Sequence, residues 1–378
     1  MMKKVHFFYP ENDLALASDR VNYTAPKAAQ CLRMAGEALP LWYGARGDEF
    51  ICAGISDRWL AEMQARFDIG VDIFHYRTSG FVPAPWGWSK TSRKIMADYG
   101  FPAEDLPSDI ALEIMRQLSH RRTASEITRQ LAASLEFPVA TAAEELMTPD
   151  EIDSFLRHTP DAMFKLPWSS SGRGLMRVRA SELSGFRDRL AGVIGRQGSV
   201  MAEPYYDRRL ADFAMLYEME AGVCTPCGFS RFSTTDAGAY SGNVLASDSS
   251  ILDGLASVYP RELLLEVQSC LCNVLAGLIG QDYSGPLGVD MMIVEHTDGK
   301  PLLVACVEMN LRMTMGHLAR RFHDCFMRPE AIGRFTVEPV QSAKTDCRPP
   351  EVFDSQLVGG CLDLVPKNPY FCIRTEIL

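Results

Sequence analysis

Two apolar segments near the end of the chain carry polar residues where a buried strand would place only apolar ones. Asp290 interrupts the apolar run 288–294, and Glu308 and Asn310 interrupt the run 305–311. Because a carboxylate that is buried alone is costly, these side chains require a partner. Glu308 and Asn310 are two positions apart, so a strand points both to one face. Three oxygen donors on adjacent strands suit Mg²⁺, with Mn²⁺ as an alternative.

The turn between these two segments decides whether the acids meet. A two-residue turn at Asp298-Gly299 would place Asp290 opposite Val307 and on the face away from Glu308. A shared metal site therefore needs an odd-length loop or a bulge. A type I turn with Gly299 in the left-handed conformation provides one. In an even register without a bulge, Asp290 is not a co-ligand of Glu308.

A second constraint lies upstream, in residues 162–179. An apolar run carries Lys165, and the segment then continues through Ser169, Ser170, Ser171, Gly172 and Gly174 into a returning strand. The pattern predicts a strand, a loop rich in hydrogen-bond donors and a second strand. Glycines let the backbone approach a ligand closely, and exposed N–H groups suit phosphate oxygens. The alternative interpretation is a mobile surface hairpin.

The first hundred residues alternate short apolar runs with amphipathic ones. Residues 5–9 and 38–43 are predicted strands, and residues 25–34 and 57–67 are predicted helices, which indicates an α/β domain with a parallel sheet. Glu11-Asn12-Asp13 follows the first strand, at the sheet end where such domains bind ligands. An Asx turn or a helix cap is the competing interpretation of that loop.

Further along the chain, two segments have clear local signals. Thr148 is a predicted helix N-cap with Glu151 as its capping-box partner. Residues 234–250 are rich in Ser, Gly, Ala and Asp and are predicted to form a loop that acts as a lid.

Composition excludes several classes of function. The 378-residue chain has a net charge of −10 and no basic stripe interleaved with aromatic residues, so no nucleic-acid partner is expected. Its eleven cysteines have no regular spacing, which predicts reduced thiols and a cytoplasmic protein. The N-terminal apolar run is too short for a membrane span or a signal core, so no membrane partner is expected.

Taken in order, Lys165, the loop 169–174, the segment 201–205, Asp290 and the run from Glu308 to Arg312 resemble the ATP-grasp superfamily of carboxylate–amine ligases. The resemblance covers about residues 115 to 325, and the region before it resembles a pre-ATP-grasp domain. It implies a mixed α+β and α/β chain, in which two α+β subdomains enclose ATP behind a small parallel-sheet domain. The expected boundaries are 1–115, 116–200 and 201–378, with the C-terminal tail in the last part.

The resemblance also implies how the nucleotide is held. Lys165 would contact the α-phosphate, and the loop 169–174 would close over the β- and γ-phosphates. Arg121 or Arg122 would be a further phosphate contact; the sequence does not decide between them. The carbonyl of Glu203 and the N–H of Tyr205 would contact adenine, since a proline between them has no N–H. The ribose would be held by Asp207 or Asp212.

For the reacting groups, the resemblance implies one or two Mg²⁺ ions on Asp290, Glu308 and Asn310. Arg312 would present its planar fork to the transferred phosphoryl group. Arg231 would clamp the substrate carboxylate, or else form a surface ion pair.

The implied reaction is attack of a carboxylate on the γ-phosphate of ATP, followed by capture of the acyl phosphate by an amine or similar nucleophile. The carboxylate would belong to a small molecule or a peptide, and a homodimer is left open. Two other classes remain: a small-molecule kinase with the same nucleotide site, and an ATP-binding module without catalysis.

Overall fold

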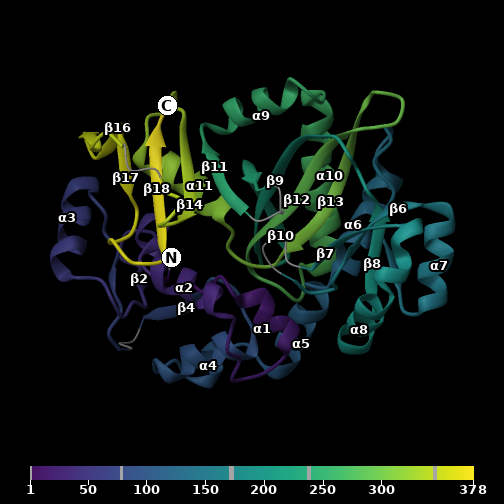
Figure 1. Cartoon of the computed structure of the whole chain (residues 1–378). Coiled ribbons are helices and arrows are strands. Elements are labelled where there is room, and N and C mark those ends of the chain that lie inside the picture. Colours follow the sequence, from purple (N-terminus) through teal and green to yellow (C-terminus); the bar gives the residue numbers. More distant parts are fainter. Residues whose placement is uncertain (1, 77–79, 170–173, 236–239, 344–346) are drawn as a thin grey trace.

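Figure 1 shows the computed structural model of the chain, which describes residues 2–76, 80–169, 174–235, 240–343 and 347–378. Within these ranges the strands form an N-terminal sheet, a lid sheet, a large sheet and one small hairpin of β15 (Glu351–Phe353) and β16 (Gln356–Gly359). The C-terminal strands return to lie beside the N-terminal region, and the N and C labels lie at opposite ends of β18 (Figure 1).

The N-terminal sheet is parallel, in the order β3-β2-β1-β4, and it confirms the predicted α/β start of the chain. Its strands are β1 (Lys3–Phe7), β2 (Glu49–Phe50), β3 (Asp72–Ile73) and β4 (Phe81–Pro85). The helices around it are α1 (Asn12–Ser18), α2 (Lys27–Gly36), α3 (Asp57–Phe67), α4 (Lys90–Asp98) and α5 (Asp109–Leu118), with a 3₁₀ turn at Ala103–Asp105. Ser56 caps α3, and Ser89 forms a capping box with Ser92 on α4.

The predicted strand at 38–43 is wrong. Leu39–Trp42 forms a 3₁₀ turn whose four side chains are all buried. An apolar run of this length does not distinguish a buried strand from a buried turn, and Pro40 cannot donate a backbone hydrogen bond to a ladder.

The lid sheet is antiparallel, in the order β5-β8-β6-β7. Its strands are β5 (Glu144–Leu146), β6 (Asp161–Lys165), β7 (Leu175–Arg179) and β8 (Val200–Pro204), and its helices are α7 (Pro149–His158) and α8 (Arg187–Gln197), with a 3₁₀ helix at Ala180–Gly185. Thr148 and Glu151 form the predicted capping box on α7. Strands β6 and β7 confirm the two predicted strands around Lys165, and residues 170–173 of the predicted loop lie outside the described residues.

The large sheet has the order β13-β12-β9-β10-β11-β14-β18-β17. Its strands are β9 (Arg209–Glu220), β10 (Val223–Thr234), β11 (Tyr240–Leu245), β12 (Gly285–Glu295), β13 (Pro301–Asn310), β14 (Gly333–Pro339), β17 (Cys361–Asp363) and β18 (Phe371–Ile377). Its helices are α6 (Arg121–Ser134), α9 (Asp248–Ala256), α10 (Arg261–Ile279) and α11 (Met315–Phe326). Helices α6, α9 and α10 share one core with β9, β12 and β13, so they cover one face of these strands.

The segment 234–250 contains more regular structure than the sequence predicts. It includes β11 and the first turn of α9, where Ser247 caps the helix. Asn243 on β11 is buried and its Nδ2 donates to Ser230 Oγ at 2.6 Å. Residues 236–239 lie outside the described ranges, so the predicted loop at 234–250 stays a prediction for that part alone.

The C-terminal tail packs on the N-terminal domain. One core joins Phe8, Trp42 and Phe67 to Leu357 and Ile373. Helix α6, in contrast, packs mainly on β13 and α10 and makes a smaller contact with β5 of the lid sheet. The expected boundaries at 115/116 and 200/201 remain predictions.

The expectation that all thiols are free is wrong at one pair. Cys347 and Cys361 form a disulfide across fourteen residues, and the Cys361 N–H bonds to the Arg348 carbonyl at 2.9 Å beside it. The fold brings the two together where β17 begins, and no spacing rule indicates this.

Among the described residues, α10 is the one helix long and apolar enough by length and composition to cross a membrane. Six of its apolar residues, including Leu264, Leu271 and Ile279, pack into the core beneath the large sheet.

Candidate nucleotide and metal site

The hairpin of β12 and β13 brings the two acids together. Gly299 has a φ of +80°, and its N–H bonds to the His296 carbonyl, so it occupies the expected left-handed position of the turn. A bulge between Asp290 and Met292 then shifts the register, and Asp290 lies directly opposite Glu308. The geometric condition set by the sequence for a shared site is met.

Asp290, Glu308 and Asn310 point to the face of the large sheet that α6 and α10 do not cover. Asn310 Nδ2 donates to Asp290 Oδ2 at 3.1 Å. Burial and the nearby Glu308 carboxylate raise the pKa of Asp290 to about 7. Two facing carboxylates that repel each other in a partly buried place fit a divalent cation, which would neutralise both.

No group of three His, Cys, Asp or Glu side chains that could hold a metal occurs in the described part of the chain. The site offers the two carboxylates of Asp290 and Glu308, whereas the predicted third ligand, the Asn310 amide oxygen, accepts from Arg312 and its Nδ2 faces Asp290. This donor set fits Mg²⁺, which uses one or two carboxylates and completes its shell with water and phosphate oxygens.

Arg121 connects the lid sheet to the facing carboxylates of Asp290 and Glu308, which we call the acid pair. Its Nη1 donates to the Leu166 carbonyl and to Ser169 Oγ, each at 2.6 Å, and its Nη2 donates to Glu308 Oε2 at 2.8 Å. Its Nε–H is buried and has no partner among the described residues. The edge formed by Nε and Nη2 is therefore half used, and it fits a phosphate group that would take both N–H donors.

Arg122 lies outside this cluster. Its side chain is 47% exposed and its nearest acidic partner is Glu145 at 3.5 Å. The geometry favours Arg121 as the phosphate contact. Ser169 is buried beside Arg121, whereas Ser170, Ser171 and Gly172 lie outside the described residues.

Gly174 lies just before β7, at the base of the hairpin that β6 and β7 form (the lid hairpin). Its φ is +81°, its carbonyl accepts from the Leu166 N–H at 3.1 Å, and a Cβ there would lie 2.9 Å from Leu166 Cδ1. Its glycine character serves this turn, which is a structural reason rather than the predicted approach to a ligand.

Lys165 and Glu203 form a buried ion pair, with Nζ 2.6 Å from Oε1. Both residues belong to the lid sheet, Lys165 on β6 and Glu203 on β8. Burial raises the pKa of the Cys306 thiol, and the charges of Asp290, Lys165, Glu308 and Glu203 all act on it. All four charges therefore lie within electrostatic range of Cys306 on β13.

The predicted adenine contact at Tyr205 is wrong for its N–H. That donor is already bonded to the Asp161 carbonyl at 3.0 Å, because β8 continues its pairing with β6. The Tyr205 ring is covered by the Arg177 guanidinium at 3.6 Å, and Arg177 also forms a bidentate pair with Asp161.

Of the two predicted ribose contacts, Asp212 has the better position. It pairs with Met292 on β12, two residues along from Asp290, so it shares the face of the acid pair. Burial raises the pKa of its carboxyl. Asp207 is 80% exposed in its side chain and lies 3.8 Å from Arg177.

Arg312 does not present its fork to an open site. Nε and Nη2 donate to the two carboxylate oxygens of Asp13 at 2.8 and 2.6 Å. The predicted fork contact with a phosphoryl group is therefore replaced by a contact with the N-terminal domain. The sequence singled out the loop of Asp13 but did not connect it to Arg312.

Arg231 is not part of the cluster. On β10 it lies opposite Phe213, whereas Ser230 lies opposite Ala214 and Ala214 opposite Asp290. Since neighbouring residues of a strand alternate between faces, Arg231 points to the face covered by α9, where its Nη1 lies near Gly254. Its predicted role as a clamp on the substrate carboxylate does not agree with this position.

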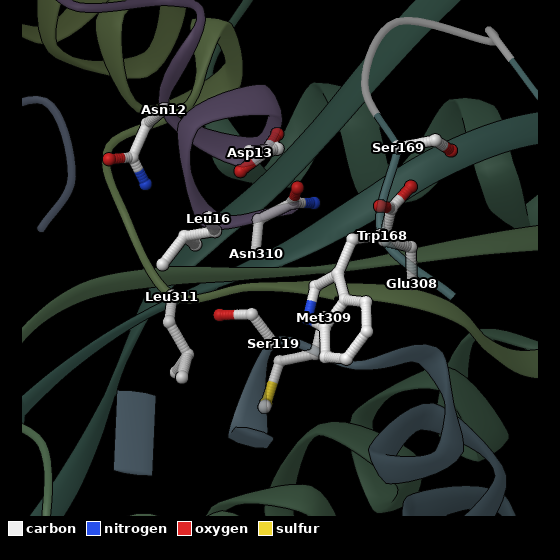
Figure 2. Close-up of a pocket in the computed structure, with 10 residues that line it drawn as sticks. All are labelled: Asn12, Asp13, Leu16, Ser119, Trp168, Ser169, Glu308, Met309, Asn310 and Leu311. Atoms are coloured by element: carbon white, nitrogen blue, oxygen red, sulfur yellow. The ribbon is translucent and has the colours of Figure 1, made fainter. Parts of the chain in front are cut away.

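A small pocket opens beside the acid pair, between α1, β13 and the base of the lid hairpin. It is lined by Asn12, Asp13, Leu16, Ser119, Trp168, Ser169, Glu308, Met309, Asn310 and Leu311. Figure 2 shows Asp13 on α1 close to Asn310, and Glu308 beside Ser169. The sequence did not identify Trp168, whose indole N–H donates to the Arg116 carbonyl and whose ring packs on His120.

Comparison with known proteins agrees with this architecture. The biotin carboxylase of Campylobacter jejuni, solved as a β,γ-ATP complex, aligns with 100% of this chain and 88% of its own, at 12% identity and a TM-score of 0.53. The biotin carboxylase domain dimer of the Hydrogenobacter thermophilus 2-oxoglutarate carboxylase, solved with MgADP, ADP and bicarbonate, aligns with 100% of this chain and 86% of its own, at 11% identity and a TM-score of 0.53.

No protein-family model matches the sequence, and no curated protein matches it by sequence. At 11–12% identity, the likeness to the biotin carboxylases shows the fold alone. The chain has the ATP-grasp fold, preceded by an α/β domain with a parallel sheet.

Proposed function

We propose that the chain is an ATP- and Mg²⁺-dependent ligase that joins a carboxylate to an amine through an acyl phosphate. The observation that carries the proposal is the meeting of Arg121, with its half-used edge, and the facing carboxylates of Asp290 and Glu308. The fold supports it, because biotin carboxylase structures of this fold were solved with ATP or MgADP.

We assign phosphate binding to the basic residues of the site and cation binding to its carboxylates. Arg121 would bind phosphate oxygens through Nε and Nη2, and Lys165 would add a point charge from the lid sheet. Asp290 and Glu308 would hold Mg²⁺, which when bound supplies positive charge next to the phosphates. Catalysis would then rest on positioning and electrostatic stabilisation, without an enzyme nucleophile.

The chemistry assigned to the substrates balances without a further reactant. A carboxylate oxygen attacks the γ-phosphorus, and the bond from that phosphorus to the leaving oxygen of ADP breaks. The amine nitrogen then attacks the acyl carbon, the bond from that carbon to the phosphate oxygen breaks, and inorganic phosphate leaves while the nitrogen loses a proton to solvent. We place the carboxylate in the pocket beside Asn310 and Ser169, which offers amide and hydroxyl donors.

The proposal is tested with purified protein, Mg-ATP and a panel of small carboxylates, with hydroxylamine as the acceptor. A ligase releases ADP and forms a hydroxamate with at least one carboxylate, and Asp290→Asn loses this activity. Arg231→Gln, on the other face of the sheet, should retain it. A stable phosphoester without hydroxamate identifies a kinase instead, and ATP binding without turnover of any substrate favours a binding module.

A further inference from the structure

Nearly all N–H donors of the Arg312 guanidinium bond to other groups of the protein. A guanidinium has five N–H donors. Two bond to Asp13, a third donates from Nη2 to Asn310 Oδ1 at 2.8 Å, and a fourth donates from Nη1 to the Met313 carbonyl at 3.0 Å. One N–H is left, so Arg312 cannot give a bidentate contact to a ligand while Asp13 is in place.

Both partners of the pair are held on rigid backbone. Asp13 lies in the first turn of α1, and Arg312 lies two residues beyond the end of β13. Arg312 forms a β-bridge with Gly87, just beyond β4, and the Met313 N–H bonds to the Trp86 carbonyl at 2.8 Å. A Cβ on Gly87 would lie 2.9 Å from Arg312 Cβ, so the close approach requires glycine at that position.

This contact fills a particular place in the N-terminal sheet. Strand β1 lies between β2 and β4, so the chain changes direction across the sheet between β1 and β4. In open α/β sheets, ligands bind at this point, beyond the carboxyl ends of the strands. Here the residues that follow β1 and β4 meet Arg312 instead.

The pair continues into the acid pair through one amide group. Because Asn310 Oδ1 accepts from Arg312, its Nδ2 is turned toward Asp290, to which it donates. Asp13, Arg312, Asn310 and Asp290 thus form an unbroken chain of hydrogen bonds from α1 to β12. The Asn310 amide is thus held at both ends, by Arg312 at Oδ1 and by Asp290 at Nδ2, and loss of Arg312 would leave it held at one end.

We propose that Asp13 is a positioning residue for the cation site, acting through the orientation of Arg312 and Asn310 and not by touching substrate. The inference rests on the proposed function, because it assigns Asp290 and Glu308 to Mg²⁺. It gives the N-terminal domain a defined part in the site: that domain sets the geometry at which Asp290 and Glu308 accept the ion. Arg312 is then a positioning residue as well.

The test compares Asp13→Asn with Asp19→Asn by calorimetry. Asp19 is the C-cap residue of the same helix α1, pairs with Lys90 at 2.8 Å and does not line the pocket, so it is a matched control. ADP is titrated into each protein in EDTA and at a series of Mg²⁺ concentrations. We expect Asp13→Asn to raise the Mg²⁺ concentration needed for half-maximal enhancement of ADP binding about tenfold, with metal-free ADP affinity within about twofold of wild type. Asp19→Asn should match wild type in both.

A second variant separates positioning from a simple tie between domains. The reversed pair Asp13→Arg with Arg312→Asp keeps an ion pair but removes the donor to Asn310. We expect it to recover the melting temperature relative to Asp13→Arg alone, while the Mg²⁺ requirement stays raised. Recovery of both, or a wild-type Mg²⁺ requirement in Asp13→Asn, would overturn the inference and leave the proposed function standing. If wild-type protein binds no ADP with or without Mg²⁺, the proposed function fails, and the inference fails with it.

Discussion

Arg121 and Arg312 lie on two sides of the same acid pair, and the structure uses their guanidinium groups in opposite ways. On Arg121, the edge formed by Nε and Nη2 has one donor on Glu308 and one donor without a partner among the described residues. On Arg312, the same edge is closed by the carboxylate of Asp13. The lid side of the site is thus open to an anion, and the N-terminal side is already satisfied.

The difference teaches that residue type does not assign a role at this site. Both arginines are natural phosphate ligands, and both lie close to Asp290 and Glu308. The two arginines differ in how many guanidinium N–H donors are left without a hydrogen-bond partner among the described residues. An unsatisfied buried donor is costly, so the unpaired Nε–H of Arg121 marks a place where a ligand would lower the free energy.

The largest expected effect follows from this contrast. Arg121→Ala should weaken Mg-ATP binding by up to about a hundredfold, on the order of 2–3 kcal/mol, because it removes a charge-assisted contact to phosphate. Arg312→Lys should change Mg-ATP affinity by less than about tenfold, because it acts only through Asn310. Isothermal titration of the two variants gives the comparison.

Arg122→Ala is the control for Arg121, since it removes a neighbouring charge that is half exposed and outside the cluster. It should bind Mg-ATP like wild type. An Arg312 variant that loses more affinity than Arg121→Ala would reverse the assignment of the two arginines.

Local signals in the sequence predicted the parts of the site that depend on short-range geometry. The polar interruptions at Asp290 and Glu308 indicated the site, and Gly299 indicated the turn that it needs. Thr148 and Glu151 form their predicted cap for the same reason, because a capping box involves only neighbouring residues.

Contacts between distant segments were not predictable in this way. Asp13 and Arg312 are 299 positions apart in the chain, and nothing in either segment points to the other. The bond from the Tyr205 N–H depends on how far β8 continues along β6, which strand patterns locate only within a few residues. The run at 38–43 has the composition of a strand but forms a buried 3₁₀ turn, because Pro40 cannot donate a backbone hydrogen bond to a strand ladder.

A second prediction concerns Glu11, two residues before Asp13 on the satisfied side of the site. Burial raises the pKa of Glu11 to about 7, although Arg33 lies 3.3 Å from it. The folded state therefore holds a proton that the unfolded chain loses near pH 4.5, and the stability of the wild type falls as pH rises from about 4.5 to 7. Glu11→Gln removes this loss, so its free energy of unfolding relative to wild type should rise by on the order of 2 kcal/mol between pH 5 and pH 8.

Urea unfolding of both proteins at several pH values measures the difference. Because Glu11 lies outside the described pocket, Mg-ADP affinity should be the same in the two proteins. A pH-independent difference in stability would show that Glu11 is ionised in the folded protein. A change in Mg-ADP affinity would extend the open part of the site to the N-terminal loop.

The smallest expected effect tests whether Glu308 and a phosphate compete for Arg121. Glu308 Oε2 accepts from the Arg121 Nη2 that a phosphate would need. Glu308→Gln weakens this hold and removes a negative charge, so ADP in EDTA should bind about fivefold more tightly than to wild type, a gain of about 1 kcal/mol. With Mg²⁺ present the order should reverse, because the variant has lost a carboxylate ligand of the cation.

Calorimetry under the two conditions gives both values for one protein. Weaker binding in EDTA as well as in Mg²⁺ would mean that Glu308 holds Arg121 in place for phosphate, so that the half-used edge is a fixed support and not an open site.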